Sequence, residues 1–262
     1  MIKKFFERFY MGIILLFLYA PIFILIILSF NKSKSRAKWG GFTFHWYREL
    51  FKNEQMMSAL TTTLIIAFLS ALIATIIGTT ASLAINNMKR VPRAIMMTIT
   101  DIPMLNADIV TGISLMLIFI ALKYRLGFTS VLLSHITFNI PYVILSVMPK
   151  LKQLNPNTFE AALDLGATPF YAFRKVILPD IAPGIMSGFF LSFTMSLDDF
   201  VITHFTKGPE TNTLSTLIYT EVRKGIKPEI YALSTIMFVT VLILLIIVNR
   251  KGAEKKSPTV VR

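Results

Sequence analysis

Long apolar runs alternate with short polar and basic stretches along this chain. A helix needs about 20 mainly apolar residues to cross the hydrocarbon core of a bilayer, and several runs meet or approach that length. The pattern therefore predicts an all-α, polytopic membrane protein with a single transmembrane domain over residues 1–262. Six spans are expected, at residues 11–30, 60–85, 101–122, 126–148, 181–206 and 231–248.

The first and third of these spans are the least regular. Lys3, Lys4 and Arg8 precede the first span, as in a signal peptide, but a cleaved signal has a shorter apolar core of about 7–15 residues. We therefore expect an uncleaved span there. The third apolar run, Ile109–Leu122, is too short to cross alone, so its span must extend back past Asp108.

The composition supports a membrane protein and narrows its chemistry. Only 16% of the residues are charged and 54% are apolar, whereas a soluble domain carries about 25% charged residues. Cysteine is absent and only three histidines occur, so we expect no disulfide, no thiolate metal site and no metal centre. The phosphate-binding sequences GKS and GKT are also absent, which argues against a P-loop nucleotide site.

The chain is strongly basic, with a formal net charge of +13. In a soluble protein this balance would suggest nucleic acid, but here the basic residues cluster between apolar runs, where they contact lipid headgroups. Six spans put both termini on one side, which carries 15 Lys and Arg residues against 12 on the other. This split favours cytoplasmic termini, with residues 250–262 forming a basic cytoplasmic tail.

The polar segment 155–179 has the features of a folded loop. Asn155 can cap a first helix, Gly166 suits a left-handed helix stop, and Thr168 can cap a second short helix. Leu178-Pro179 is then expected to close the unit before the fifth span. Ordering such a loop costs conformational entropy, which favours a loop that docks against a partner over an ordinary surface loop with local helix.

Within this loop, Glu160-Ala161-Ala162, Gly166 and Val176-Ile177-Leu178-Pro179 keep the spacing of a known motif. They resemble the EAA loop of permeases in binding-protein-dependent ABC importers, with Val176 where isoleucine is usual. In that family the loop forms a coupling helix that sits in a groove of a separate ATPase subunit. The resemblance assigns ATPase coupling to Glu160, Ala161, Ala162, Gly166, Leu178 and Pro179.

Three further segments resemble the spermidine/putrescine branch of the same family. They are SHITFNIPYVI at 134–144, LSFTMSLDDFVITHFTKGP at 191–209 and VRKGIKPEIYAL at 222–233. The resemblance implies a type I importer in a bacterial cell (inner) membrane, built from two homologous permeases, two ATPase subunits and an external polyamine-binding protein. ATP hydrolysis would then belong to the ATPase subunits, so this chain is expected to be no enzyme and to need no cofactor.

The acids inside the predicted spans point to the cargo. No Lys or Arg lies within the six spans, but four aspartates do: Asp108, Asp198 and Asp199, and Asp101 at the end of the third span. A lone charge at the bilayer centre costs roughly 2.5–3.5 kcal/mol on insertion scales. On the fifth span, small and polar residues share one helix face, and Asp198 lies at the edge of this face; they are Gly184, Gly188, Ser192, Ser196, Asp199 and Thr203. We interpret this face as the lining of a passage for a cationic cargo, although small residues at this spacing can also pack helices. The predicted pathway residues are Asp108, Asp198, Asp199, Ser192 and Ser196.

Other classes of protein fit less well. An ion-coupled secondary transporter would carry protons on Asp198 and Asp199, but it predicts an internal repeat, of which we find none, and leaves segment 155–179 unexplained. An intramembrane aspartyl hydrolase needs two carboxylates from separate spans; Asp108 could supply one, but no accompanying motif supports it. An ABC permease for another small solute remains open, as does the choice between spermidine and putrescine.

Overall fold

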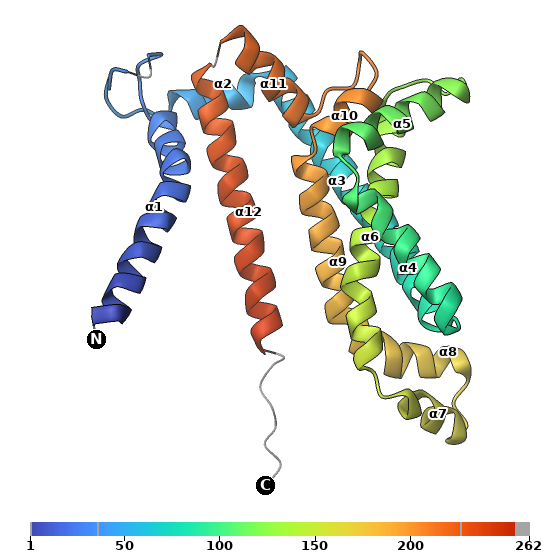
Figure 1. Ribbon diagram of the computed structural model, residues 1–262. Helices are drawn as coiled ribbons and strands as arrows, with labels where there is room; N and C mark the ends of the chain where they lie inside the picture. The colour runs from blue at the N-terminus through green and yellow to red at the C-terminus, as the bar shows by residue number, and fades with distance from the viewer. Residues whose placement is uncertain (1, 36, 226, 255–262) are drawn as a thin grey trace. The chain divides into compact units, whose positions relative to one another are not determined.

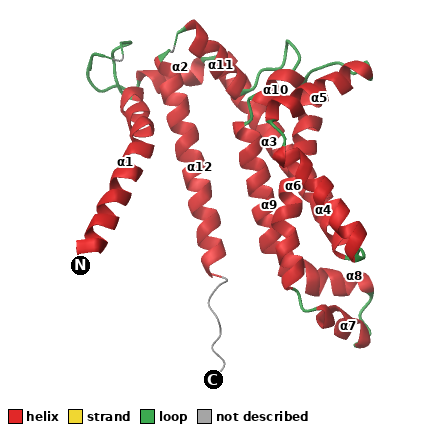
Figure 2. Cartoon of the chain, in the orientation of Figure 1, coloured by secondary structure: helices red, strands yellow, loops and turns green. Residues whose placement is uncertain are grey.

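The computed structural model describes residues 2–35, 37–225 and 227–254, and these are predominantly helical (Figure 2). Within these ranges the extended pairing is a single isolated antiparallel bridge between Asn31 and Phe42. The chain divides into two compact units. The larger comprises residues 58–217, and the smaller comprises residues 1–57 and 218–262.

The larger unit is a helical bundle centred on α6 and α9, which pack against each other. Figure 1 shows α3, α6 and α9 running along one another, with α7 and α8 at one end of the unit and α5 and α10 at the other. Its apolar core joins α3, α6 and α9 through Ala74, Val143, Val147, Leu151 and Ile181. The helices are α3 (Glu54–Asn86), α4 (Arg90–Leu105), α5 (Asp108–Ala121), α6 (Phe128–Gln153), α7 (Pro156–Asp164), α8 (Pro169–Ala172), α9 (Leu178–Asp198) and α10 (Val201–Thr206).

Glycines let α9 approach α6 closely. A Cβ atom on Gly184 would lie 2.9 Å from the backbone oxygen of Ser146, and one on Gly188 would lie 3.2 Å from the Cα of Val143. Both distances are shorter than ordinary van der Waals contact, so larger residues would push the helices apart. This part of the small-residue face predicted on the fifth span therefore serves helix packing.

The third predicted span, 101–122, is wrong as a continuous helix. Two helices, α4 and α5, meet there at an angle of 102°. Asn106 and Ala107 are extended between them, and Pro103 removes a backbone donor from the last turn of α4. The apolar pattern runs through this break, because both helices present apolar residues on either side of it.

The fifth predicted span, 181–206, is wrong at both ends. Its helix starts earlier, because α8 continues through a π-helical segment η1 (Phe173–Ile177) into α9, giving one helical stretch over 169–198. It also stops earlier, since Asp199 is extended and α10 begins at Val201. The Asp199 carboxylate accepts the backbone N–H groups of Ile202 and Thr203, which gives that backbone an alternative to a continuous helix.

The loop 155–179 shows the predicted caps. The Asn155 side chain accepts the N–H of Asn157, the Thr168 hydroxyl accepts that of Tyr171, and Gly166 has φ of +85°. The expectation that Leu178-Pro179 closes the loop is wrong, because both residues lie in the first turn of α9.

The π-helical segment explains how the helix passes this proline. The N–H of Leu178 bonds to the carbonyl of Phe173, five residues back. A proline ring ordinarily clashes with the carbonyl four residues before it, and it supplies no N–H. The wider π turn relieves that crowding, so Pro179 lies in a continuous helix.

The smaller unit contains α1 (Ile2–Ser29), α2 (His45–Lys52), most of α11 (Leu214–Lys224) and α12 (Pro228–Glu254). Both α1 and α2 pack against α12, and the Trp46 indole donates a 2.7 Å hydrogen bond to the carbonyl of Asn31. On α11 the carboxylate of Glu221 lies 2.9 Å from the ammonium of Lys227, which lowers the pKa of Glu221.

The described helices account for four or five membrane spans. Four described helical stretches are long and apolar enough to cross a membrane, and the bent pair α4 and α5 would make a fifth. The first predicted span lies in α1 and the sixth, 231–248, lies in α12. Because α12 extends to Glu254, the predicted tail begins as helix, and 255–262 lie outside the described residues. Six crossings therefore stay a prediction.

Candidate functional site

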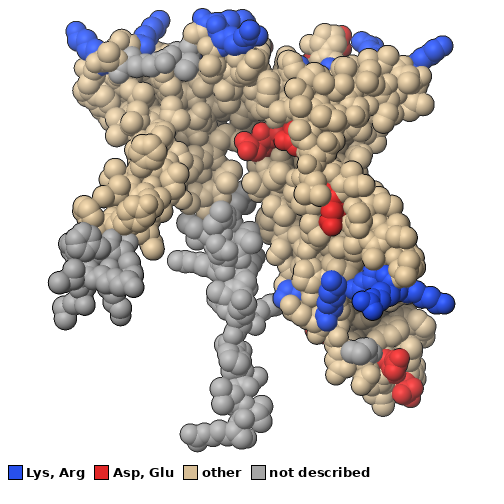
Figure 3. Space-filling view, in the orientation of Figure 1, with Lys and Arg blue, Asp and Glu red and all other residues tan. Residues whose placement is uncertain are grey.

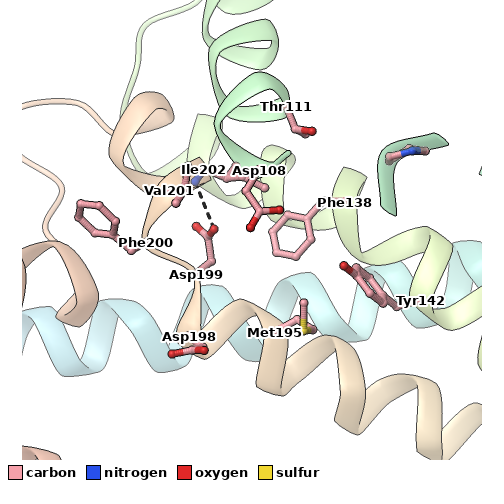
Figure 4. Close-up of a pocket in the computed structure, with 11 residues that line it drawn as sticks. Asp108, Thr111, Phe138, Tyr142, Met195, Asp198, Asp199, Phe200, Val201 and Ile202 are labelled. Carbon is pink, nitrogen blue, oxygen red and sulfur yellow. Dashed lines mark hydrogen bonds between the residues drawn. The ribbon is translucent and has the colours of Figure 1, made fainter. Parts of the chain in front are cut away.

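The two helix breaks of the larger unit meet at one cavity. Since α10 packs against α5, the first turns of these two short helices lie close together. The cavity has a volume of about 200 Å³ and receives side chains from α4, α5, α6, α9 and α10 (Figure 4). Its lining consists of Pro103, Asp108, Thr111, Phe138, Tyr142, Met195, Asp198, Asp199, Phe200, Val201 and Ile202.

All three aspartates predicted for the pathway border this cavity. Asp108 lies in the first turn of α5, Asp198 is the last residue of α9, and Asp199 precedes α10. Figure 4 shows the carboxylates of Asp108 and Asp199 turned toward the same space, whereas Asp198 lies apart on α9. The helix breaks in the third and fifth predicted spans thus place the acids at the cavity. A row of residues along one face of a continuous helix would not bring them together there.

The three acids differ in how firmly they are held. Asp108 and Asp198 are exposed, and the described part of the chain offers neither of them a hydrogen-bond or ion-pair partner. Asp199 is only 8% exposed at its side chain and is tightly bonded. One carboxylate oxygen accepts the N–H of Ile202 at 3.1 Å, and the other accepts the N–H and the hydroxyl of Thr203, both at 2.7 Å. Asp199 is therefore fixed, while Asp108 and Asp198 are free to meet a solute.

Aromatic and apolar side chains supply the remaining walls. Phe138 and Tyr142 come from α6, Met195 from α9, and Phe200 from the segment between α9 and α10. Sequence reasoning missed Phe138 and Tyr142, although their spacing of four residues places them on one helix face. That spacing, within a predicted span that resembles the polyamine branch, was the signal that could have found them.

The two serines predicted for the pathway lie elsewhere. Ser192 and Ser196 are buried in the bundle, and neither borders the cavity. The Ser196 hydroxyl lies 2.6 Å from Nδ1 of His135, and that of Ser192 has no hydrogen-bond partner among the described residues. The face of α9 that carries them is turned toward neighbouring helices, in line with the packing of Gly184 and Gly188.

Charge in the larger unit is segregated by position. Figure 3 shows Lys and Arg gathered at both ends of the larger unit, with acidic atoms also at the end that carries α7 and α8, whereas the band between the ends shows acidic atoms alone. The cavity lining contains three carboxylates and no Lys or Arg. A site of this composition attracts cations and repels anions.

The predicted coupling residues form a second surface. Glu160 and Ala161 are exposed on α7, and Ala162 and Gly166 border a shallow depression together with Leu165, Ala167, Thr168 and Tyr171. Leu165 is 89% and Phe170 is 74% exposed. Leu178 and Pro179 begin α9. Large apolar side chains on a short loop are typical of a protein interaction site.

These features define a class: a helical membrane protein with an acidic cavity and an exposed interaction loop. The model of the family described as "Binding-protein-dependent transport system inner membrane component" matches residues 74–250. This chain belongs to that family, which confirms the resemblance inferred from its motifs, and it is a membrane component of an ABC transport system.

Relatives with assigned transport roles resemble the chain over most of its length. The spermidine/putrescine transport system permease protein PotC of Escherichia coli K12 is 40% identical over 237 residues, which is 90% of each chain. The putrescine transport system permease protein PotI of the same strain is 41% identical over 84% of this chain and 81% of its own length. The PotC protein of Haemophilus influenzae is 37% identical over 94% of this chain and 96% of its own.

Solved structures show the same fold at lower identity. A bacterial ABC transporter involved in the import of the acidic polysaccharide alginate superposes with a TM-score of 0.74 and 21% identity, covering 98% of each chain. The MetNI methionine ABC transporter, in inward-facing conformations, gives a TM-score of 0.60 at 18% identity and covers 77% of this chain and 96% of its own. The fold is therefore that of an ABC importer permease.

Proposed function

We propose that this chain is one permease subunit of an ATP-driven importer of polyamines such as spermidine or putrescine. It would form the membrane pathway together with a second, homologous permease. Two separate ATPase subunits would power transport, and an external binding protein would deliver the cargo. The observation that carries the proposal is the cavity at the two helix breaks, with three carboxylates, three aromatic side chains and no cation in its lining.

The chemistry of the cavity favours a polyamine over other small solutes. A polyamine has ammonium groups joined by apolar methylene segments, which match carboxylates interleaved with Phe138, Tyr142 and Phe200. Each ammonium–carboxylate hydrogen bond is worth roughly 1.5–3 kcal/mol, and an aromatic face adds attraction for a cation. The fold alone does not choose the cargo, because the alginate transporter that shares it imports an acidic polysaccharide. The proposal of a polyamine as the cargo therefore rests on the three carboxylates of this cavity.

The loop that contains α7 and α8 supports coupling to an ATPase. Its caps and the positive φ of Gly166 hold two short helices at a turn, and Leu165 and Phe170 present apolar side chains to solvent. Burying such side chains against a partner is favourable by about 1.5–3 kcal/mol each. The same loop is joined to α9 without a helix break, since η1 carries the helix through to Asp198. A movement of the docked loop would therefore reach the acidic cavity along one helical stretch.

We further propose that both termini and this loop face the cytoplasm, which the distribution of basic residues favours. The chain has no native cysteine, so single cysteines can be probed without background. Cysteine at Ser35 or Glu210 is expected to react with a membrane-impermeant maleimide in intact cells, whereas cysteine at Thr158 reacts only after the membrane is opened. The reverse pattern would place the loop outside and refute the coupling role.

The function is tested by purification and reconstitution. The chain, co-expressed with the genes adjacent to its own, is expected to co-purify with a second permease and an ATPase. Vesicles that contain this complex should take up radiolabelled spermidine or putrescine only with ATP and the binding protein, while an anionic solute is excluded. A chain that purifies as a homodimer and transports with an ion gradient alone would instead be a secondary transporter. Uptake of another solute but no polyamine would keep the class and refute the cargo.

A further inference from the structure

A buried histidine lies behind the acidic cavity. His135, in the first half of α6, has a side chain that is 2% exposed, and it does not line the cavity. Its ring nitrogens contact α9 on one side and α10 on the other. The polar groups that connect to it come from four helices and are all buried or nearly so: Ser70, Asn139, Ser196, Asp199 and Thr203.

The hydrogen bonds around Asp199 determine which ring nitrogen carries a proton. A carboxylate can only accept, so the Thr203 hydroxyl, 2.7 Å away, must donate its hydrogen to Asp199. Thr203 has then no hydrogen left for His135 Nε2, which lies 2.9 Å from the same hydroxyl oxygen. Nε2 must therefore be the donor, and it also lies 3.4 Å from the Asp199 carboxylate.

The other ring nitrogen receives a hydrogen bond. In a neutral ring with its proton on Nε2, Nδ1 is an acceptor, so the Ser196 hydroxyl, 2.6 Å away, donates its hydrogen to Nδ1. The Ser70 hydroxyl lies 3.1 Å from the Ser196 oxygen and 3.2 Å from the carbonyl oxygen of Ala67, and can donate to either. Further back, the Asn139 amide donates to Ser70 at 3.5 Å. From Ser196 onward the bonds form a chain in which each group donates in the same direction, through His135 and Thr203 to the Asp199 carboxylate.

We propose that His135 is a positioning residue that acts through Asp199, as a neutral ring with its proton on Nε2. Aligned donors reinforce one another in a buried environment, so the chain holds the Asp199 charge in place beside the cavity. It also ties α6 and α9 to the start of α10. This role rests on the proposed function, in which Asp199 attracts a cationic cargo that the free carboxylate of Asp108 then contacts.

Two substitutions test whether the hydrogen-bond donor at Nε2 matters, as distinct from the volume of the His135 ring. The amide of Gln in His135→Gln reaches the position of Nε2 and can donate toward Thr203. The shorter amide of His135→Asn reaches only the position of Nδ1 and leaves Asp199 without this support. We expect His135→Asn to raise the KM for polyamine uptake about tenfold, which corresponds to about 1.4 kcal/mol, with an unchanged maximal rate. His135→Gln should stay within about threefold of the parent.

A double-mutant cycle distinguishes positioning from packing. In an Asp199→Asn background, His135→Asn should add less than about a twofold change, because the group through which it acts is gone. Independent, multiplying effects would assign His135 a packing role and overturn the proposal. If the parent complex itself takes up no polyamine, the proposed function fails instead, so the two failures are distinguishable.

A spectroscopic measurement tests the chain without any transport. The complex is labelled with ¹⁵N-histidine and held in lipid for an NMR spectrum. This subunit has only two histidines besides His135, and the signal that is lost in the spectrum of His135→Gln belongs to His135. Its ¹⁵N shifts should report a neutral ring protonated at Nε2. A ring protonated at Nδ1, or at both nitrogens, would overturn the proposal even if the variants transport as expected. This measurement also stands if His135→Asn fails to assemble.

Discussion

Replacing Asp108 by asparagine is expected to lower the efficiency of polyamine uptake ten- to a hundredfold while the complex assembles normally. Asp108 is exposed in the cavity, and the described residues give it no hydrogen-bond or ion-pair partner, so its removal breaks no internal contact. Asparagine keeps the volume and removes the charge. The loss corresponds to one ammonium–carboxylate contact of roughly 1.5–3 kcal/mol, at about 1.4 kcal/mol for each factor of ten.

The measurement is initial-rate uptake into reconstituted vesicles across a range of polyamine concentrations. Asp101→Asn is the matched control, since Asp101 lies on α4 within the same pair of helices but does not border the cavity. It should transport within about twofold of the parent, because Asp101 lies outside the cavity lining. Equal uptake by Asp108→Asn and the parent at every concentration would show that this acid does not meet the cargo. The proposed cargo would then rest on similarity to the relatives alone.

Asp199→Asn is a less direct probe of charge. The Asp199 carboxylate caps the backbone of Ile202 and Thr203 as well as carrying charge, so an amide there also alters the start of α10. Losing part of a helix cap costs about 1 kcal/mol. A fall in uptake in this variant therefore combines two effects, whereas the Asp108 variant changes only one.

The helices were predictable because their causes are local. The apolar length of α3 and α6 and the caps Asn155 and Thr168 require no knowledge of the rest of the fold. The breaks at Asn106 and Asp199 were not predictable from apolar length, because apolar residues continue on both sides of each break. Whether an aspartate in such a run stays in a helix or caps a new one depends on partners that only the folded bundle provides.

The residues of the candidate site also divide into those that the sequence predicts and those that it does not. The three aspartates were predictable, because a charge within an apolar span has few positions where it is tolerated. The exclusion of Ser192 and Ser196 was not, since a face of small residues suits a passage and a helix contact equally well. Only the position of α6 against α9 decides between them. Phe138 and Tyr142 escaped notice because aromatic residues are ordinary in a span until a cavity is known to lie beside them.

The coupling loop offers the second large effect, through Gly166. This residue has φ of +85°, and a Cβ atom there would meet nothing within 4 Å, so a substitution acts on the backbone alone. Valine in this left-handed conformation costs about 1–2 kcal/mol, so Gly166→Val should displace α8 relative to α7. Combined with Glu160→Arg, which reverses an exposed charge on α7, it is expected to reduce polyamine-stimulated ATP hydrolysis at least about tenfold, since each 1.4 kcal/mol of docking free energy is tenfold.

A graded series distinguishes coupling from folding of the loop. Asparagine tolerates the left-handed conformation better than valine, so Gly166→Asn should retain most of the stimulation. The assay is ATP hydrolysis in vesicles with and without polyamine-loaded binding protein, together with the amount of ATPase that co-purifies. We expect Gly166→Val to lose both ATPase binding and stimulation while the permease pair remains assembled, because α7 and α8 lie at one end of the bundle, outside the α3, α6 and α9 core. Normal stimulation in the Gly166→Val, Glu160→Arg double variant would mean that the ATPase docks on another surface. The exposed Leu165 and Phe170 would then require a different partner.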